Sequence, residues 1–152
     1  MSNLPLHTRR LSGLVNRPGG ITVSEAVVAA EANLATIRVR GLDEITSTLA
    51  KIQTIGEALR AGPNPVKQTE LYDLSNILVG VCGVFGMGGL GEVAFSLCSL
   101  LDRMREAGVW SMPSVQTHLD SLRLLHSATL EPAAMAAVTA ALRQVVERVP
   151  AA

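Results

Sequence analysis

Apolar or small residues recur from residue 23 to residue 59 in steps of three and four, and this spacing constrains the fold more than any other feature. The positions are Val23, Val27, Ala30, Leu34, Ile37, Gly41, Ile45, Leu49, Ile52, Gly56 and Leu59. With 3.6 residues per turn, an α-helix places all of them on one side, so the spacing predicts one long amphipathic helix. Two alternatives stay open for it: a core helix, or a helix with one flank in its own bundle and another against a partner.

The start of this helix and a weak point within it are both marked in the sequence. Thr22 followed by Glu25 is the pattern of a capping box, which predicts that the helix begins there. Gly41 costs about 1 kcal/mol inside a helix, so a break or kink at that residue stays open. The preceding residues have three arginines and no long apolar run, and we expect residues 1–21 to be a flexible leader before a single domain over residues 22–150.

Four further helices are predicted beyond a clear breaker at residues 61–65, AGPNP. They begin near Lys67, at Leu90, at Ser111 or Pro113, and at the Glu131–Pro132 pair. No alternating strand pattern competes with them. The expected fold class is therefore all-α, an antiparallel bundle of helices with short connections.

The composition excludes several function classes. The 152 residues include 13 Lys and Arg against 13 Asp and Glu, so no net field attracts nucleic acid or an anionic membrane. Cys82 and Cys98 lack a CxxC pattern or a histidine at ligand spacing, which indicates reduced core residues in a cytoplasmic protein and no metal site. Residues 77–101 are long enough to span a membrane, but their glycines and Glu92 argue against a span.

The motif GMGGLG at residues 86–91 contains the GxGxxG of a dinucleotide-binding turn. Such a site needs a sheet around it, and the chain offers at most one strand, at residues 77–85, whose backbone would lack a partner. The spacing of Leu71, Leu74, Leu78 and Phe85 favours helix through the same residues. The motif therefore predicts a turn between helices, and no cofactor is expected.

The side of the second predicted helix away from its core stripe has an unusual composition. It consists of Tyr72, Asp73, Asn76, Val79, Gly80 and Gly83. A solvated face is normally charged, whereas this one has two glycines that permit close approach. Two interpretations follow: burial against the first helix, with Gly80 and Gly83 at the crossing, or a docking surface for another protein.

Residues 76–90 resemble the motif of histidine-phosphotransfer (HPt) domains. That motif is HxLKGxxxxxG, followed after three residues by the leucine of the next helix. The chain reads NILVGVCGVFG from Asn76 to Gly86 and then MGGL, so Leu78, Gly80, Gly86 and Leu90 match. The resemblance covers roughly residues 71–102 and implies an antiparallel four-helix bundle of HPt type with a long N-terminal helix. With its Trp110 loop, the whole chain is also similar to the small alphaproteobacterial proteins called chemotaxis protein E.

Two departures from the motif change the chemistry. Asn76 stands where the family has its phosphate-accepting histidine, and Val79 replaces the usual lysine. An amide nitrogen is not nucleophilic like an imidazole, so no catalytic residue is expected. The resemblance implies a non-catalytic, pseudo-phosphotransfer protein of chemotaxis or two-component phosphorelay signalling. Its expected partner is a response-regulator receiver domain or a histidine kinase, bound through Tyr72, Asp73, Asn76, Val79, Gly80 and Gly83.

Two alternatives come from other function classes. One is a structural homodimer or scaffold that uses the second helix or the flank of the first helix and binds no receiver. The other is a phosphocarrier that uses His118 or His126, which lie two turns apart in one predicted helix. Neither histidine is followed by a glycine at the family's spacing.

Overall fold

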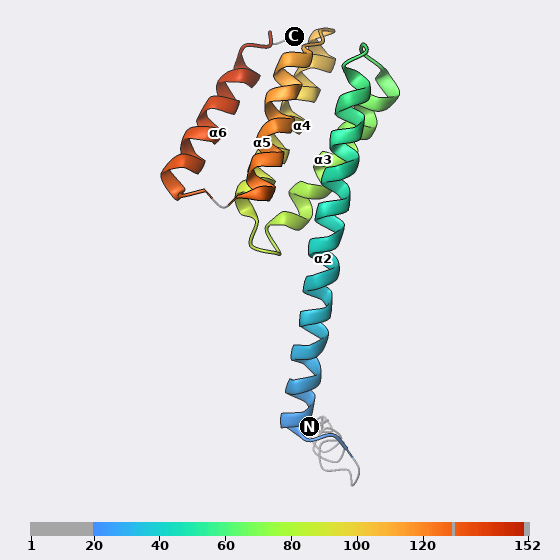
Figure 1. The fold of residues 1–152 in the computed structure, drawn as a ribbon, viewed down its shortest axis with the longest axis vertical. Coiled ribbons are helices and arrows are strands. Elements are labelled where there is room, and N and C mark those ends of the chain that lie inside the picture. The colour runs from blue at the N-terminus through green and yellow to red at the C-terminus, as the bar shows by residue number, and fades with distance from the viewer. Residues whose placement is uncertain (1–19, 129, 151–152) are drawn as a thin grey trace, which may run out of the picture. The chain divides into compact units, whose positions relative to one another are not determined.

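The computed structural model describes residues 20–128 and 130–150, which form five α-helices and no strand (Figure 1). The helices are α2 (Val23–Leu59), α3 (Pro65–Cys82), α4 (Gly88–Ala107), α5 (Met112–Ser127) and α6 (Pro132–Glu147). The all-α prediction is confirmed. Most of the predicted leader, residues 1–19, lies outside the described residues.

The chain divides into two compact units, one up to Ile37 and one from Arg38 onward, with the boundary inside α2. In the first unit the capping box is formed as predicted. The Thr22 amide donates to Glu25 Oε2 over 2.7 Å, and the Glu25 amide donates back to Thr22 Oγ1 over 3.2 Å. None of the α2 residues from Val23 to Ile37 is buried.

The second unit packs the rest of α2 and the other four helices around one hydrophobic core. Helix α4 has a central place, since it packs against α3, α5 and α6. The fully buried side chains include Ile45, Ile52, Leu59, Leu71, Leu78, Leu97, Leu100, Leu119, Leu122 and Leu142. The apolar spacing read from the sequence therefore supplies the core from Ile45 onward.

Two glycines of α2 lie where another side chain occupies the space of a Cβ atom. An ideal Cβ on Gly41 would lie 2.0 Å from Cζ of Phe85, and one on Gly56 would lie 2.3 Å from Cδ1 of Leu119. The helix runs through Gly41 without a break. Its glycine is explained by close packing against the residues that follow α3, and the suggested break there does not occur.

Side-chain caps and glycines set the ends of the other helices. Asn64 caps α3 by accepting from the Lys67 amide over 3.1 Å, with Pro65 in the first turn, and Ser111 caps α5. In the turn between α3 and α4, Gly86 has a φ of 76°, in the left-handed region. The GMGGLG segment thus joins two helices, and the candidate strand at residues 77–85 is helical up to Cys82 and a turn beyond it.

The membrane-span alternative for residues 77–101 finds no support in the structure. The segment is divided between α3 and α4 by the glycine-containing turn. In the described part of the chain, no helix is both long enough and apolar enough to cross a bilayer.

Candidate functional site

The six residues predicted as a docking surface form a strip along one side of α3 and its C-terminal cap. Asp73, Asn76, Gly80 and Gly83 are exposed, whereas Tyr72 and Val79 are half-buried. No atom lies within 4 Å of an ideal Cβ on Gly80 or Gly83. The interpretation that these two glycines are crossing points against the first helix is therefore wrong.

The strip lies on the side of α3 that borders α4. The thiol of Cys98 in α4 lies 3.8 Å from the carbonyl oxygen of Tyr72, and an ideal Cβ on Gly91 would lie 3.3 Å from Cβ of Cys82. Contact with α2 falls elsewhere, through Phe85 on Gly41. The strip is thus bounded by α4 along one edge and open along the other.

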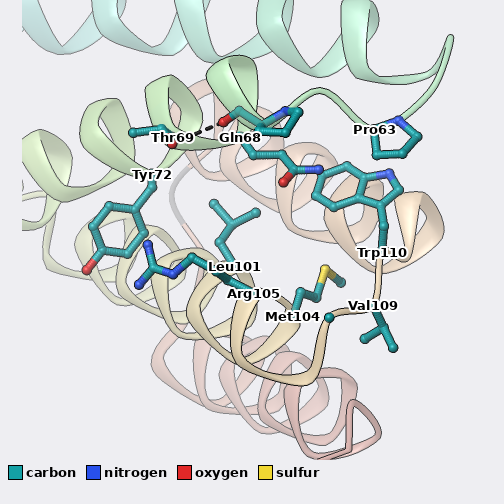
Figure 2. Close-up of a pocket in the computed structure, with 11 residues that line it drawn as sticks. Pro63, Gln68, Thr69, Tyr72, Leu101, Met104, Arg105, Val109 and Trp110 are labelled. Atoms are coloured by element: carbon teal, nitrogen blue, oxygen red, sulfur yellow. Dashed lines mark hydrogen bonds between the residues drawn. The ribbon is translucent and has the colours of Figure 1, made fainter.

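A hollow of about 500 Å³ lies at the Tyr72 end of the strip, between the start of α3 and the end of α4 (Figure 2). Its lining includes Pro63, Gln68, Tyr72, Met104, Arg105 and Trp110. Tyr72 and Trp110 are the chain's single tyrosine and single tryptophan. Both types are common among residues that dominate binding energy, as is arginine, so the hollow concentrates the chain's best contact residues.

Charged groups surround the Tyr72 ring. The guanidinium carbon of Arg105 lies 5.8 Å from the ring centroid, and Arg105 also forms an ion pair with Asp102. The Asp102 carboxylate raises the pKa of the Tyr72 hydroxyl, because a second negative charge beside it is unfavourable. Tyr72 therefore stays a neutral hydrogen-bonding group.

A second hollow, of about 720 Å³, lies at the other end of the strip. Val79 of α3 and Gly83, the C-terminal cap of α3, line it together with Phe95 of α4 and Arg143 of α6. Phe95 is 62% exposed, although phenylalanine side chains are usually buried. It is one of only two phenylalanines in the chain. Asp73, Asn76 and Gly80 are the strip residues that line neither hollow, so the strip connects two concave regions.

Sequence reasoning missed Phe95 and Trp110 as members of this surface. A signal for Phe95 was present, since it falls outside the core spacing of Leu90, Val93 and Leu97 in α4. Trp110 lies in a loop, where residue spacing does not predict which way a side chain points.

His118 is buried in α5 with both ring nitrogens occupied. Its Nδ1 lies 2.9 Å from the carbonyl oxygen of Ser114, and its Nε2 lies 2.9 Å from Oγ of Ser96 in α4. A carbonyl only accepts, so the proton sits on Nδ1 and the Ser96 hydroxyl donates to Nε2. An imidazole placed in this way has no free nitrogen for a phosphoryl group, which disfavours the phosphocarrier alternative at His118.

The pair of Ser96 and His118 also lacks the surroundings of a nucleophile. Ser96 lies within α4, where the neighbouring backbone N–H groups bond to carbonyls of the same helix. They therefore cannot form an oxyanion hole. The other histidine in α5, His126, is exposed, and its Nε2 lies 3.1 Å from Oγ1 of Thr46.

Acid should destabilise the fold through His118. Burial lowers the pKa of its imidazole below the ordinary value of 6.5, so below that pH the unfolded chain takes up a proton that the folded chain does not. This contribution to stability is complete above pH 6.5 and is lost as the pH falls toward the folded-state pKa. We expect urea unfolding at successive pH values to show this loss, and His118→Gln to have a smaller pH slope than wild type. Equal slopes would contradict the assignment.

Both cysteines lie in the core with free thiols, which confirms the predicted burial. Burial raises the pKa of Cys82 and of Cys98 to about 11 each. At neutral pH both thiols are therefore protonated and unreactive. Among the described residues, no group of three or more His, Cys, Asp or Glu side chains is placed to hold a metal ion.

Comparisons of the chain with protein-family models, with curated proteins and with solved structures found no match.

Proposed function

We propose that this chain is a non-catalytic, HPt-like binding protein of two-component or chemotaxis signalling in the cytoplasm. In this proposal a response-regulator receiver domain or a histidine kinase docks on the α3 strip, and no phosphate is carried. The all-helical second unit is compatible with the HPt-type four-helix arrangement that the proposal requires. The proposal combines the motif resemblance with the geometry of the strip.

The observation that supports it best is the open space at Gly80 and Gly83. A glycine inside a helix is less favourable than alanine by about 1 kcal/mol. Gly41 and Gly56 have a reason inside the fold, because another side chain fills the Cβ space. Gly80 and Gly83 have neither such a neighbour nor a positive φ. The close approach of a partner's backbone would explain why glycine is present at these two positions.

The residues around these glycines suit a protein partner. The Asn76 side chain is exposed and has both a donor and an acceptor to offer. Phe95 and Val79 supply apolar area in the hollow beside Gly83, and Tyr72 and Trp110 supply it in the hollow at the other end. A helix seated along the strip would place side chains in both hollows.

Because Asn76 is not a nucleophile, we propose a binding function without phosphotransfer. An asparagine at the phosphoacceptor position leaves the docking shape without the transfer chemistry. Such a protein would compete with true phosphotransfer domains for a receiver, or would hold a kinase or receiver in place.

Gly80→Arg should weaken binding of the partner at least tenfold, because a long charged side chain would stand where the partner's backbone approaches. The measurement is titration of purified protein against the receiver domains and histidine kinases encoded in the same genome. Thr117→Arg is the matched control, since it adds the same side chain at an exposed position of α5 that lines neither hollow. If no receiver or kinase binds wild type, or if Gly80→Arg binds as tightly as wild type, the proposal fails.

A further inference from the structure

The larger hollow, of about 720 Å³, contains opposite charges that are neighbours but do not pair. Glu92 of α4 is held beside α6, because its Oε2 accepts a hydrogen bond from Oγ1 of Thr139 over 3.3 Å. Arg143 follows Thr139 by one helical turn, on the same side of α6, and lines the same hollow. In the part of the chain that the structure describes, Arg143 forms no ion pair. A carboxylate and a guanidinium thus both remain open to a ligand.

A second acceptor lies one turn along α4 from Glu92. Ser96 is half-buried and lines the hollow, and its hydroxyl donates to Nε2 of His118 over 2.9 Å. Because that bond uses its one proton, the Ser96 oxygen can only accept from a group in the hollow. The α4 side therefore offers two acceptors, Glu92 and Ser96, and the α6 side offers the donors of Arg143.

The other two charged residues of the hollow lie further along the same helices. Nε of Arg103 donates to the carbonyl oxygen of Val149 over 2.6 Å, and Arg103 is about 16 Å along the α4 axis from Glu92. Glu147 follows Arg143 by one turn, so it lies on the far side of Arg143 from Glu92. The end of the hollow at Glu92 is therefore where acceptors and a cation meet.

Apolar surface lies next to these polar groups. Phe95 precedes Ser96 in α4, is largely exposed and lines the hollow together with Val79 of α3. Small-ligand sites have volumes of roughly 300–1,000 Å³ and combine apolar walls with a few polar groups that fix the orientation of the ligand. This hollow has that size and that combination.

We propose that this hollow binds an apolar α-amino acid as a free zwitterion. Glu92 and Oγ of Ser96 bind its ammonium group, Arg143 binds its carboxylate, and its side chain packs on Phe95. A ligand with a single charge would leave either Glu92 or Arg143 without a counter-charge. The amino acid needs no protein partner, so this site is independent of the proposed signalling function, although the hollow shares Val79 and Gly83 with the α3 strip.

The first test is calorimetric titration of the full chain with L-phenylalanine, L-leucine and two analogues of phenylalanine. The analogues are 3-phenylpropionate, which lacks the ammonium group, and 2-phenylethylamine, which lacks the carboxylate. We expect a Kd on the order of 100 μM for L-phenylalanine and binding at least tenfold weaker for each analogue. Neither amino acid binding saturably up to about 10 mM would overturn the proposal, as would an analogue that binds as tightly as L-phenylalanine.

The carboxylate contact is tested by Arg143→Gln, which should weaken L-phenylalanine binding at least tenfold. Arg148→Gln is the matched control, because Arg148 is exposed, caps the same helix and lies outside both hollows. The control should bind within about twofold of wild type. Equal affinities of Arg143→Gln and wild type would overturn the site.

The ammonium contact is tested by Glu92→Gln. This variant should bind L-phenylalanine about tenfold more weakly, yet bind 3-phenylpropionate no more weakly than wild type, because that analogue has no ammonium group. The control Glu106→Gln removes an exposed carboxylate of α4 outside both hollows and should change neither affinity. A Glu92→Gln variant that keeps the wild-type preference for L-phenylalanine over 3-phenylpropionate would overturn the proposal. Circular dichroism of each variant verifies that the helices are retained.

Discussion

His118→Ala is expected to lower the free energy of unfolding by about 3 kcal/mol. The substitution removes a fully buried ring and leaves a cavity between α4 and α5. It also leaves the Ser96 hydroxyl without its buried acceptor. Urea unfolding monitored by circular dichroism measures the change.

His126→Ala provides the control on the same helix. This histidine is exposed and has one contact, to Thr46, so its loss should change stability by less than about 0.5 kcal/mol. Similar losses for the two variants would show that His118 is not held as described. The comparison is informative because residue type, substitution and helix are the same, whereas burial and hydrogen bonding differ.

Gly56→Val should destabilise the protein by about 3 kcal/mol, the upper range for overpacking a core. The first added carbon would lie 2.3 Å from Cδ1 of Leu119, which is buried in the core. The valine's methyl groups would increase the conflict. Thermal and urea unfolding of the purified variant measure the effect.

Two further variants separate overpacking from helix propensity. Gly80→Val adds the same side chain to a helix position with open space, so it should stay within about 0.5 kcal/mol of wild type. Adding Leu119→Ala to Gly56→Val should cost less than the sum of the two single changes, since each makes room for the other. Strict additivity would mean that Leu119 is not the obstacle.

The helices were predictable because their signals are local. A strong three-and-four spacing, the Thr22–Glu25 capping box and the AGPNP breaker each act within a few residues. The prediction of a helix from about Lys67 was two residues late, because the Asn64 cap with Pro65 in the first turn was not recognised.

The surroundings of each glycine were not predictable in the same way. Gly41, Gly56 and Gly80 all lie in helices, and only the folded structure shows that the first two are filled by Phe85 and Leu119 and the third is open. The same limit applies to His118, whose partner Ser96 lies on another helix. The residues of the α3 strip could be placed on one side of a helix from their spacing, whereas the hollows at the ends of the strip depend on α4, α6 and the Trp110 loop.

The hollow beside Tyr72 gives the protein an intrinsic optical label. Trp110 is its single tryptophan, so all indole emission comes from the wall of that hollow. A partner that enters would displace water from the ring and shift the emission wavelength. A titration followed by Trp110 fluorescence therefore reports docking in this hollow directly, without any added dye.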